Sequence, residues 1–153
     1  MKKIIILLLF LSLINCKENK EIEKVEPEIQ NPYVRLMPPG SANTGAFMEI
    51  SNPSKQDLKL IGVSSDVANM VEIHNHISED GMMKMRKVEF VPIPAGGKAV
   101  LKPGSFHVML MGLKNDLQEK QVIQIGLEFS NGLKKTIQAE VKKIDMEHQH
   151  SHP

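Results

Sequence analysis

The stretch Val122-Ile-Gln-Ile-Gly-Leu-Glu-Phe129, followed by Asn131-Gly132 and a second alternating segment at 134–141, decides the fold class. In the first part every second residue is apolar, at 123, 125, 127 and 129. Side chains of a strand point alternately to its two faces, so this pattern predicts half-buried strands. Asn-Gly between two such segments is typical of a two-residue turn. Together they predict an antiparallel β-hairpin.

Turn signals rich in Pro, Gly, Asn and Asp recur through the chain from Asn31 onward. They separate segments with strand character at 33–37, 44–51, 58–64, 70–77, 82–90, 97–102, 106–113, 121–130 and 133–143. This spacing, near 8–12 residues, is typical of a β-sandwich or barrel. We therefore predict one all-β domain over residues 32–144.

The N-terminal residues predict export. Lys2 and Lys3 precede an apolar run at 4–14, which as a helix would span about 16 Å, roughly half of a membrane's hydrocarbon core. Residues 1–15 are therefore interpreted as a signal peptide. Leu13-Ile14-Asn15-Cys16 resembles a bacterial lipobox, in which the cysteine becomes the lipidated first residue. Because Asn15 stands where Gly, Ala or Ser is usual, an ordinary signal peptide with a free Cys16 thiol is the alternative.

Residues 16–31 are predicted to be a lipidated cysteine and a flexible tether, because they mix both charges with few apolar residues. The protein would then be held at the periplasmic face of a bacterial membrane. Residues 145–153 form a tail in which His148, His150 and His152 alternate with other residues. Histidine tracts bind metal, and without a thioether shell this one suits Cu(II). Deleting the tail is therefore expected to remove Cu(II) binding.

Composition argues against several function classes. Lys and Arg number 19 against 18 Asp and Glu, a net charge of +1, whereas nucleic-acid binding calls for a strongly basic surface. A single cysteine excludes an intrachain disulfide and a Cys-rich zinc site. The sequence offers no paired carboxylates, no nucleophile with an evident base and no Gly-rich phosphate loop, so no enzyme is predicted.

Two segments combine histidine with methionine, and the first is a predicted hairpin at 71–86. His74 and His76 precede Gly81, and Met85 follows it. A four-residue loop would place His74 opposite Met85, and a two-residue loop would place His76 there. Either register puts an imidazole beside a thioether on one face.

In the second segment, 104–112, the period of two places His107, Met109 and Met111 on one face. The alternatives are methionines that fill gaps in the core and a hydrogen-bonded surface histidine. Neutral imidazoles and soft thioethers together favour Cu(I), whereas Mg²⁺ and Ca²⁺ need oxygen ligands and a blue-copper site needs a thiolate. The pattern favours copper binding, and a structural or adhesive β-sandwich is the competing interpretation.

These residues resemble a known family. The spacing His74, ten residues, Met85, twenty-one residues, His107, one residue, Met109 is similar to the signature of the periplasmic copper chaperones called PCu(A)C. The similarity extends over about residues 32–143, including 82–86, 93–97 and 107–113.

The resemblance implies a cupredoxin-like Greek-key β-sandwich and one Cu(I) held by His74, Met85, His107 and Met109. It also implies delivery toward the copper centre of cytochrome c oxidase subunit II, often with a thioredoxin-like copper protein of the Sco type. His76 and Met111 are not signature positions and are treated as neighbours. The alternative function is a copper-buffering or structural surface lipoprotein.

Overall fold

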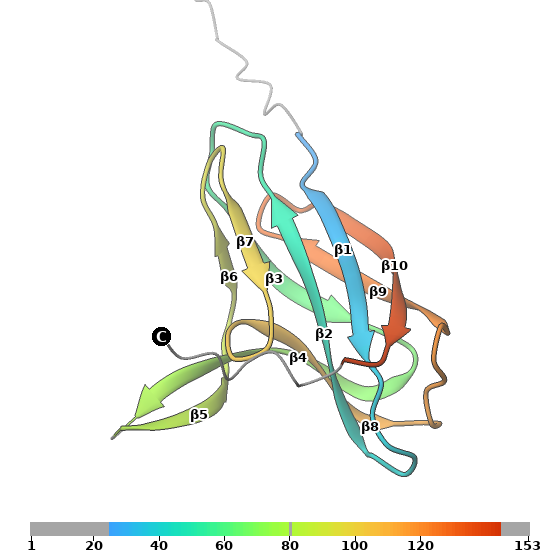
Figure 1. Cartoon of the computed structure of the whole chain (residues 1–153). Coiled ribbons are helices and arrows are strands. Elements are labelled where there is room, and N and C mark those ends of the chain that lie inside the picture. The colour runs from blue at the N-terminus through green and yellow to red at the C-terminus, as the bar shows by residue number, and fades with distance from the viewer. Residues whose placement is uncertain (1–24, 80, 145–153) are drawn as a thin grey trace, which may run out of the picture.

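The computed structural model describes residues 25–79 and 81–144. In this part the chain forms ten strands and no helix (Figure 1), so the all-β prediction is confirmed. The strands are β1 (Glu28–Arg35), β2 (Asn43–Ser51), β3 (Leu58–Ser64), β4 (Ala68–Glu79), β5 (Met82–Lys87), β6 (Val91–Ile93), β7 (Lys98–Leu101), β8 (His107–Leu113), β9 (Val122–Phe129) and β10 (Lys134–Lys142).

The predicted signal peptide, Cys16 and the three tail histidines lie outside the described residues. Within the described part of the chain, no helix is long and apolar enough to cross a membrane.

The strands form one sheet in the order β5-β4-β8-β2-β1-β10-β9-β3-β6, with β7 also paired to β2. Between these ten strands of the described residues, β1 and β10 pair in parallel and the other pairings are antiparallel. The sheet curls over so that one face encloses the apolar core, while β4 and β5 project from the body as a long hairpin (Figure 1). This projecting hairpin carries part of the candidate site.

The core is built from the inward-facing positions of the alternating strands. In β9 the buried residues are Ile123, Ile125, Leu127 and Phe129, as the period-two pattern predicts. Val108 and Leu110 of β8 are also fully buried. Residues 107, 109 and 111 of β8 consequently lie on the opposite, outer face of the sheet.

The turn between β9 and β10 differs from the prediction by one residue. Ile125 lies opposite Ile137, and the turn between Phe129 and Leu133 holds three residues, ending in Gly132 with a φ of 81°. The inward apolar residues of both strands have odd numbers. Two odd-numbered residues can lie opposite each other only when the loop has an odd number of residues. The predicted two-residue turn is therefore wrong, and the burial of the apolar face sets the register.

The start of β1 and the presence of β6 also differ from the prediction. Strand β1 begins at Glu28, which pairs with Ser51, so residues 28–31 of the predicted tether lie in the sheet. Backbone pairing needs no apolar pattern, and this polar stretch therefore shows no strand signal. Strand β6 is not predicted from the sequence, because Pro92 is typical of a turn. The proline is tolerated there because β6 is an edge strand, in which a residue without an N–H need not break a hydrogen bond of the sheet.

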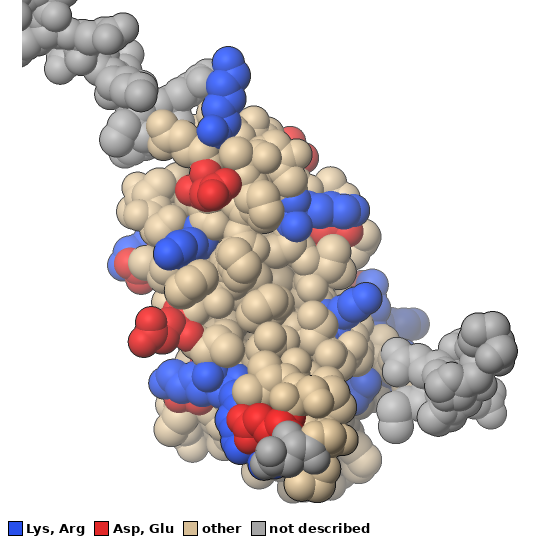
Figure 2. Space-filling model, turned by 90° about the vertical axis from the view of Figure 1, so that its left-hand side faces the viewer, with Lys and Arg blue, Asp and Glu red and all other residues tan. Residues whose placement is uncertain are grey.

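Acidic and basic side chains are interspersed on the face shown in Figure 2, with no continuous patch of one sign. Exposed ion pairs include Lys98 with Glu49 at 3.0 Å and Lys134 with Glu128 at 3.3 Å. Such pairs contribute at most about 1 kcal/mol each. The stability of the domain therefore comes mainly from its core.

Candidate metal centre

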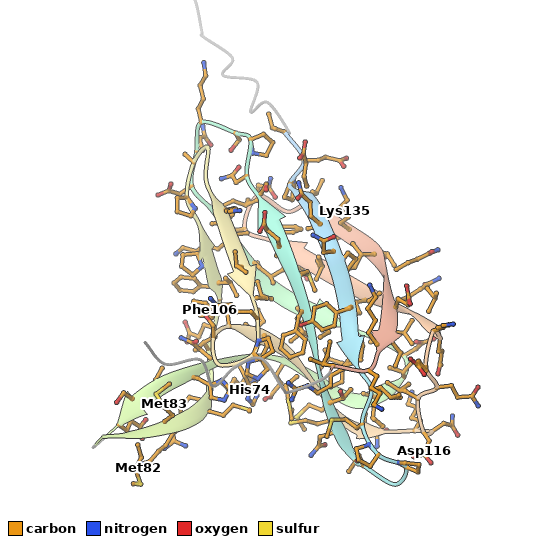
Figure 3. The ribbon with its side chains drawn as sticks, in the orientation of Figure 1. His74, Met82, Met83, Phe106, Asp116 and Lys135 are labelled. Atoms are coloured by element: carbon orange, nitrogen blue, oxygen red, sulfur yellow. The ribbon has the colours of Figure 1, made fainter. Side chains whose placement is uncertain are left out.

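The histidines and methionines singled out from the sequence lie on the outer face of β4, β5 and β8. The first half of β4 pairs with β8 and the second half with β5. Because directly opposed residues point to the same side, the even-numbered residues of β4 share a face with the odd-numbered residues of its two neighbours. In Figure 3, His74 lies near the base of the projecting hairpin, and Met82 and Met83 lie near its tip.

The structure decides between the two registers of this hairpin. His76 lies opposite Met85 and His74 lies opposite Lys87, as a two-residue loop requires. Gly81 in that loop has a φ of 76°, a conformation that favours glycine and suits tight hairpins. The four-residue-loop alternative is therefore wrong. On its other side, His74 lies directly opposite His107.

Three imidazole rings gather on this face. The ring centroid of His107 is 6.0 Å from that of His74 and 5.3 Å from that of His76. Met85 is on the same face through its pairing with His76, and Met109 is two residues from His107 along β8. The structure thus brings the four residues of the signature to one face and adds His76. Met111 lies two residues further along, opposite Met70.

Hydrogen bonds fix which nitrogen is free on two of the rings. Nε2 of His74 donates to Glu72 at 2.9 Å, and Glu72 also accepts from Nζ of Lys87 at 2.6 Å. These two hydrogen bonds hold the pKa of Glu72 below its usual range, and the bond from Lys87 has the larger effect. Nδ1 of His107 donates to the carbonyl of Ser105 at 2.8 Å. In the neutral form each imidazole has one N–H, and with these bonds in place the lone pair is then on Nδ1 of His74 and on Nε2 of His107.

These free nitrogens are buried without a partner. Among the described residues, the buried side-chain nitrogens that lack a hydrogen bond include Nδ1 of His74, Nδ1 of His76 and Nε2 of His107. Leaving such an atom unpaired costs about 1–3 kcal/mol. Metal-binding histidines usually donate their other N–H to a carboxylate or a carbonyl, as His74 and His107 do here. The residues present therefore fit a bound metal ion.

The environment of His107 keeps its ring neutral. Burial lowers the pKa of His107; the hydrogen bond to Ser105 opposes this, and nearby His76 and His74 add to the lowering. The ring is 3% exposed and lies 6.2 Å from the ring of Phe47. The surface-histidine alternative is therefore wrong. Neutral imidazole is the form that binds metal.

The methionines differ in exposure. Met85 is 42% exposed, whereas Met109 is half-buried. When only His, Cys, Asp and Glu are counted, the described residues contain no group of three arranged to hold a metal ion. The chemistry on this face is that of imidazole nitrogens mixed with thioether sulfurs.

The site contains residues to which the sequence analysis gave no role. Counting by two from His74 along the strand reaches Glu72, so the period alone could have placed Glu72 on this face. Phe47 comes from β2 and Ser105 from the loop before β8, and no local pattern connects either to the histidines. Those two required the tertiary structure.

Comparison with known proteins identifies the family. The model of the LpqE-like lipoproteins matches residues 28–141. The chain belongs to the LpqE-like family. One relative, from Leifsonia xyli subsp. xyli (strain CTCB07), bears the name "Putative lipoprotein Lxx21020" and is 34% identical over 104 residues. The match covers 67% of this LpqE-like chain and 63% of the relative, less than two thirds of the latter's length.

Solved structures of similar fold include copper-bound proteins. The solution structure of CuI-DR1885 from Deinococcus radiodurans superposes with a TM-score of 0.65 at 31% identity, covering 83% of this chain and 85% of that one. The copper-bound PCuAC domain from PmoF2 gives a TM-score of 0.67 at 21% identity, covering 78% and 95%, and supports the fold alone. The resemblance to PCu(A)C and the cupredoxin-like fold are therefore confirmed.

Proposed function

We propose that this LpqE-like protein is an exported copper carrier that binds one Cu(I) through His74, Met85, His107 and Met109. The observation that carries the proposal is the set of buried imidazole nitrogens with free lone pairs on the same face as two thioethers. The Cu(I) form named for the Deinococcus protein supports the same metal.

The donor chemistry favours carriage over catalysis. Imidazoles and thioethers are neutral, and the soft sulfur selects Cu(I). His107 is buried and Met85 is 42% exposed, so a metal ion bound to both would be shielded from water by the first residue and accessible to a partner beside the second. A carrier needs this combination, because it must hold the ion and still present it to an acceptor.

The acceptor follows from the family resemblance. Delivery is proposed toward the copper centre of cytochrome c oxidase subunit II, with a Sco-type thioredoxin-like protein as a further partner. A lipid on Cys16 would hold the domain at the periplasmic face of the membrane in which such an acceptor is found. Buffering of copper at the membrane is the second candidate, because binding alone does not require an acceptor.

A competitive Cu(I) titration of the full chain tests the proposal. The wild type and a variant with His148, His150 and His152 replaced by alanine should each bind one Cu(I) per chain. The variant should lose the Cu(II) bound by the tail. If Cu(I) binding disappears together with the tail histidines, the outer face is not the copper site.

The Cys16→Ser variant is expected to be released from the membrane or to remain unprocessed, because a serine hydroxyl cannot replace the thiol that is lipidated. Membrane fractionation, with mass spectrometry of the mature N-terminus, checks this. An unmodified Cys16 in wild-type protein extracted from the membrane would contradict the lipoprotein assignment.

The Glu72→Ala variant is expected to weaken Cu(I) binding about 10-fold, because loss of a hydrogen-bond partner of a ligand usually costs 10–100-fold. Glu72 accepts from Nε2 of His74 and so points Nδ1 at the metal. The Glu72→Gln variant keeps an acceptor oxygen and should recover most of the affinity.

The matched control is Glu79→Ala on the same strand. Glu79 binds Arg86 at 2.8 Å and lies on the other face of the hairpin. Equal losses from the Glu72 and Glu79 variants would show a general charge effect and no positioning of His74.

A further inference from the structure

His76 lies in the candidate site although the family signature assigns it no role. It faces Met85 directly across the hairpin. Its ring is 5.3 Å from that of His107, closer than the 6.0 Å of the His74 ring. Its Nδ1 is buried without a hydrogen-bond partner, like the free nitrogens of His74 and His107. By its position and by a buried ring nitrogen that has no hydrogen-bond partner, His76 has what a metal ligand needs.

The two histidines of β4 are held differently. His74 is tied by Nε2 to Glu72, which is itself paired with Lys87. His76 belongs to the half of β4 that pairs with β5, where the hairpin projects from the body of the protein (Figure 1). His74 is therefore the anchored ring, and His76 is the histidine directly opposite the exposed Met85.

The number of donors exceeds what one ion can use. Three imidazoles and two thioethers make five, whereas Cu(I), a filled-shell ion like Zn²⁺, takes at most four ligands. The three histidines are also not arranged to hold one ion together without other donors. One imidazole is therefore in surplus at any moment.

We propose that His76 is a further copper ligand that alternates with His74, while His107 and the two thioethers remain bound. This inference rests on the proposed function and refines it. When the acceptor displaces one ligand, the ion shifts to the other histidine of β4 and does not leave the site. Copper would move along β4 from the anchored His74 toward His76, and so toward the projecting half of the hairpin, while it stays bound to Met85.

The experiment is a double-mutant cycle on the full chain, with competitive Cu(I) titration as the readout. His74→Ala and His76→Ala should each weaken binding only about 10-fold, because the remaining ring takes the place of the lost one. Independent effects would then multiply to about 100-fold. The double variant should instead lose about 1000-fold or more, since no β4 imidazole is left.

Asn75→Ala is the matched control, because it lies between the two histidines and faces the opposite side of the hairpin. Circular dichroism and thermal unfolding establish that each variant folds. If the double alanine variant does not fold, the cycle is repeated with His74→Gln and His76→Gln, which keep polarity and approximate size.

The outcomes separate this inference from the proposed function. If His76→Ala binds like wild type and His74→Ala is as weak as the double variant, the alternation is wrong and the four-residue signature site stands. If neither wild type nor any variant binds Cu(I), the proposed function fails as well. Losses that simply multiply would show two simultaneous, independent ligands and would also overturn the alternation.

Discussion

Replacing His107 with alanine is expected to lower the affinity for Cu(I) at least about 100-fold while the domain stays folded. Loss of a residue that only supports a ligand costs 10–100-fold, so loss of a ligand should cost no less. His107 has no substitute on β8, in contrast to the two histidines of β4. The substitution removes the hydrogen bond from Nδ1 to the carbonyl of Ser105, a loss of about 0.5–1.5 kcal/mol, which a domain with about 5–15 kcal/mol of stability can tolerate.

Competitive Cu(I) titration measures this effect, with circular dichroism as the check on folding. Met85→Leu and Met109→Leu, which keep size and apolarity but remove the sulfur, should also weaken binding strongly. Met82→Leu is the control, because Met82 is 59% exposed and lies on the other face of β5. Full affinity in the His107, Met85 and Met109 variants would rule out a site on this face.

The Phe129→Ala variant is expected to lose about 3–5 kcal/mol of unfolding free energy, the usual loss for a buried Phe. Phe129 is 0% exposed and is among the largest fully buried side chains of the core. A small domain has only about 5–15 kcal/mol in total, so this single change should bring the protein close to unfolding at physiological temperature.

Urea unfolding followed by circular dichroism measures the loss. Val122→Ala is the matched control, because Val122 is on the same strand and is 56% exposed. Exposed substitutions of this kind usually change stability by less than about 0.5 kcal/mol. Similar losses in both variants would mean that β9 does not face the core in the way that its alternation indicates.

The two kinds of variant separate stability from metal binding because they lie on opposite faces of the sheet. Val108 and Leu110 face the core, and His107 and Met109 of the same strand face outward. Alternation along the strand makes this separation possible. Changes at the site are therefore expected to leave the core packing largely intact.

Sequence alone determined the class of fold and the faces of individual strands. The alternation in 122–129 and 134–141 sets which residues are buried, because a strand's side chains repeat with a period of two whatever its neighbours are. The same period put His107 and Met109 on one face, and it could have added Glu72 to the face of His74.

Only the tertiary structure decided which strands are neighbours and in what register they pair. Local patterns left the hairpin of His74 and Met85 with two registers, and they favoured a turn before β10 that is one residue too short. They also could not show that His74 lies opposite His107, which follows it by 33 positions. Register depends on burying the apolar faces of all the strands together, and this is a property of the whole sheet.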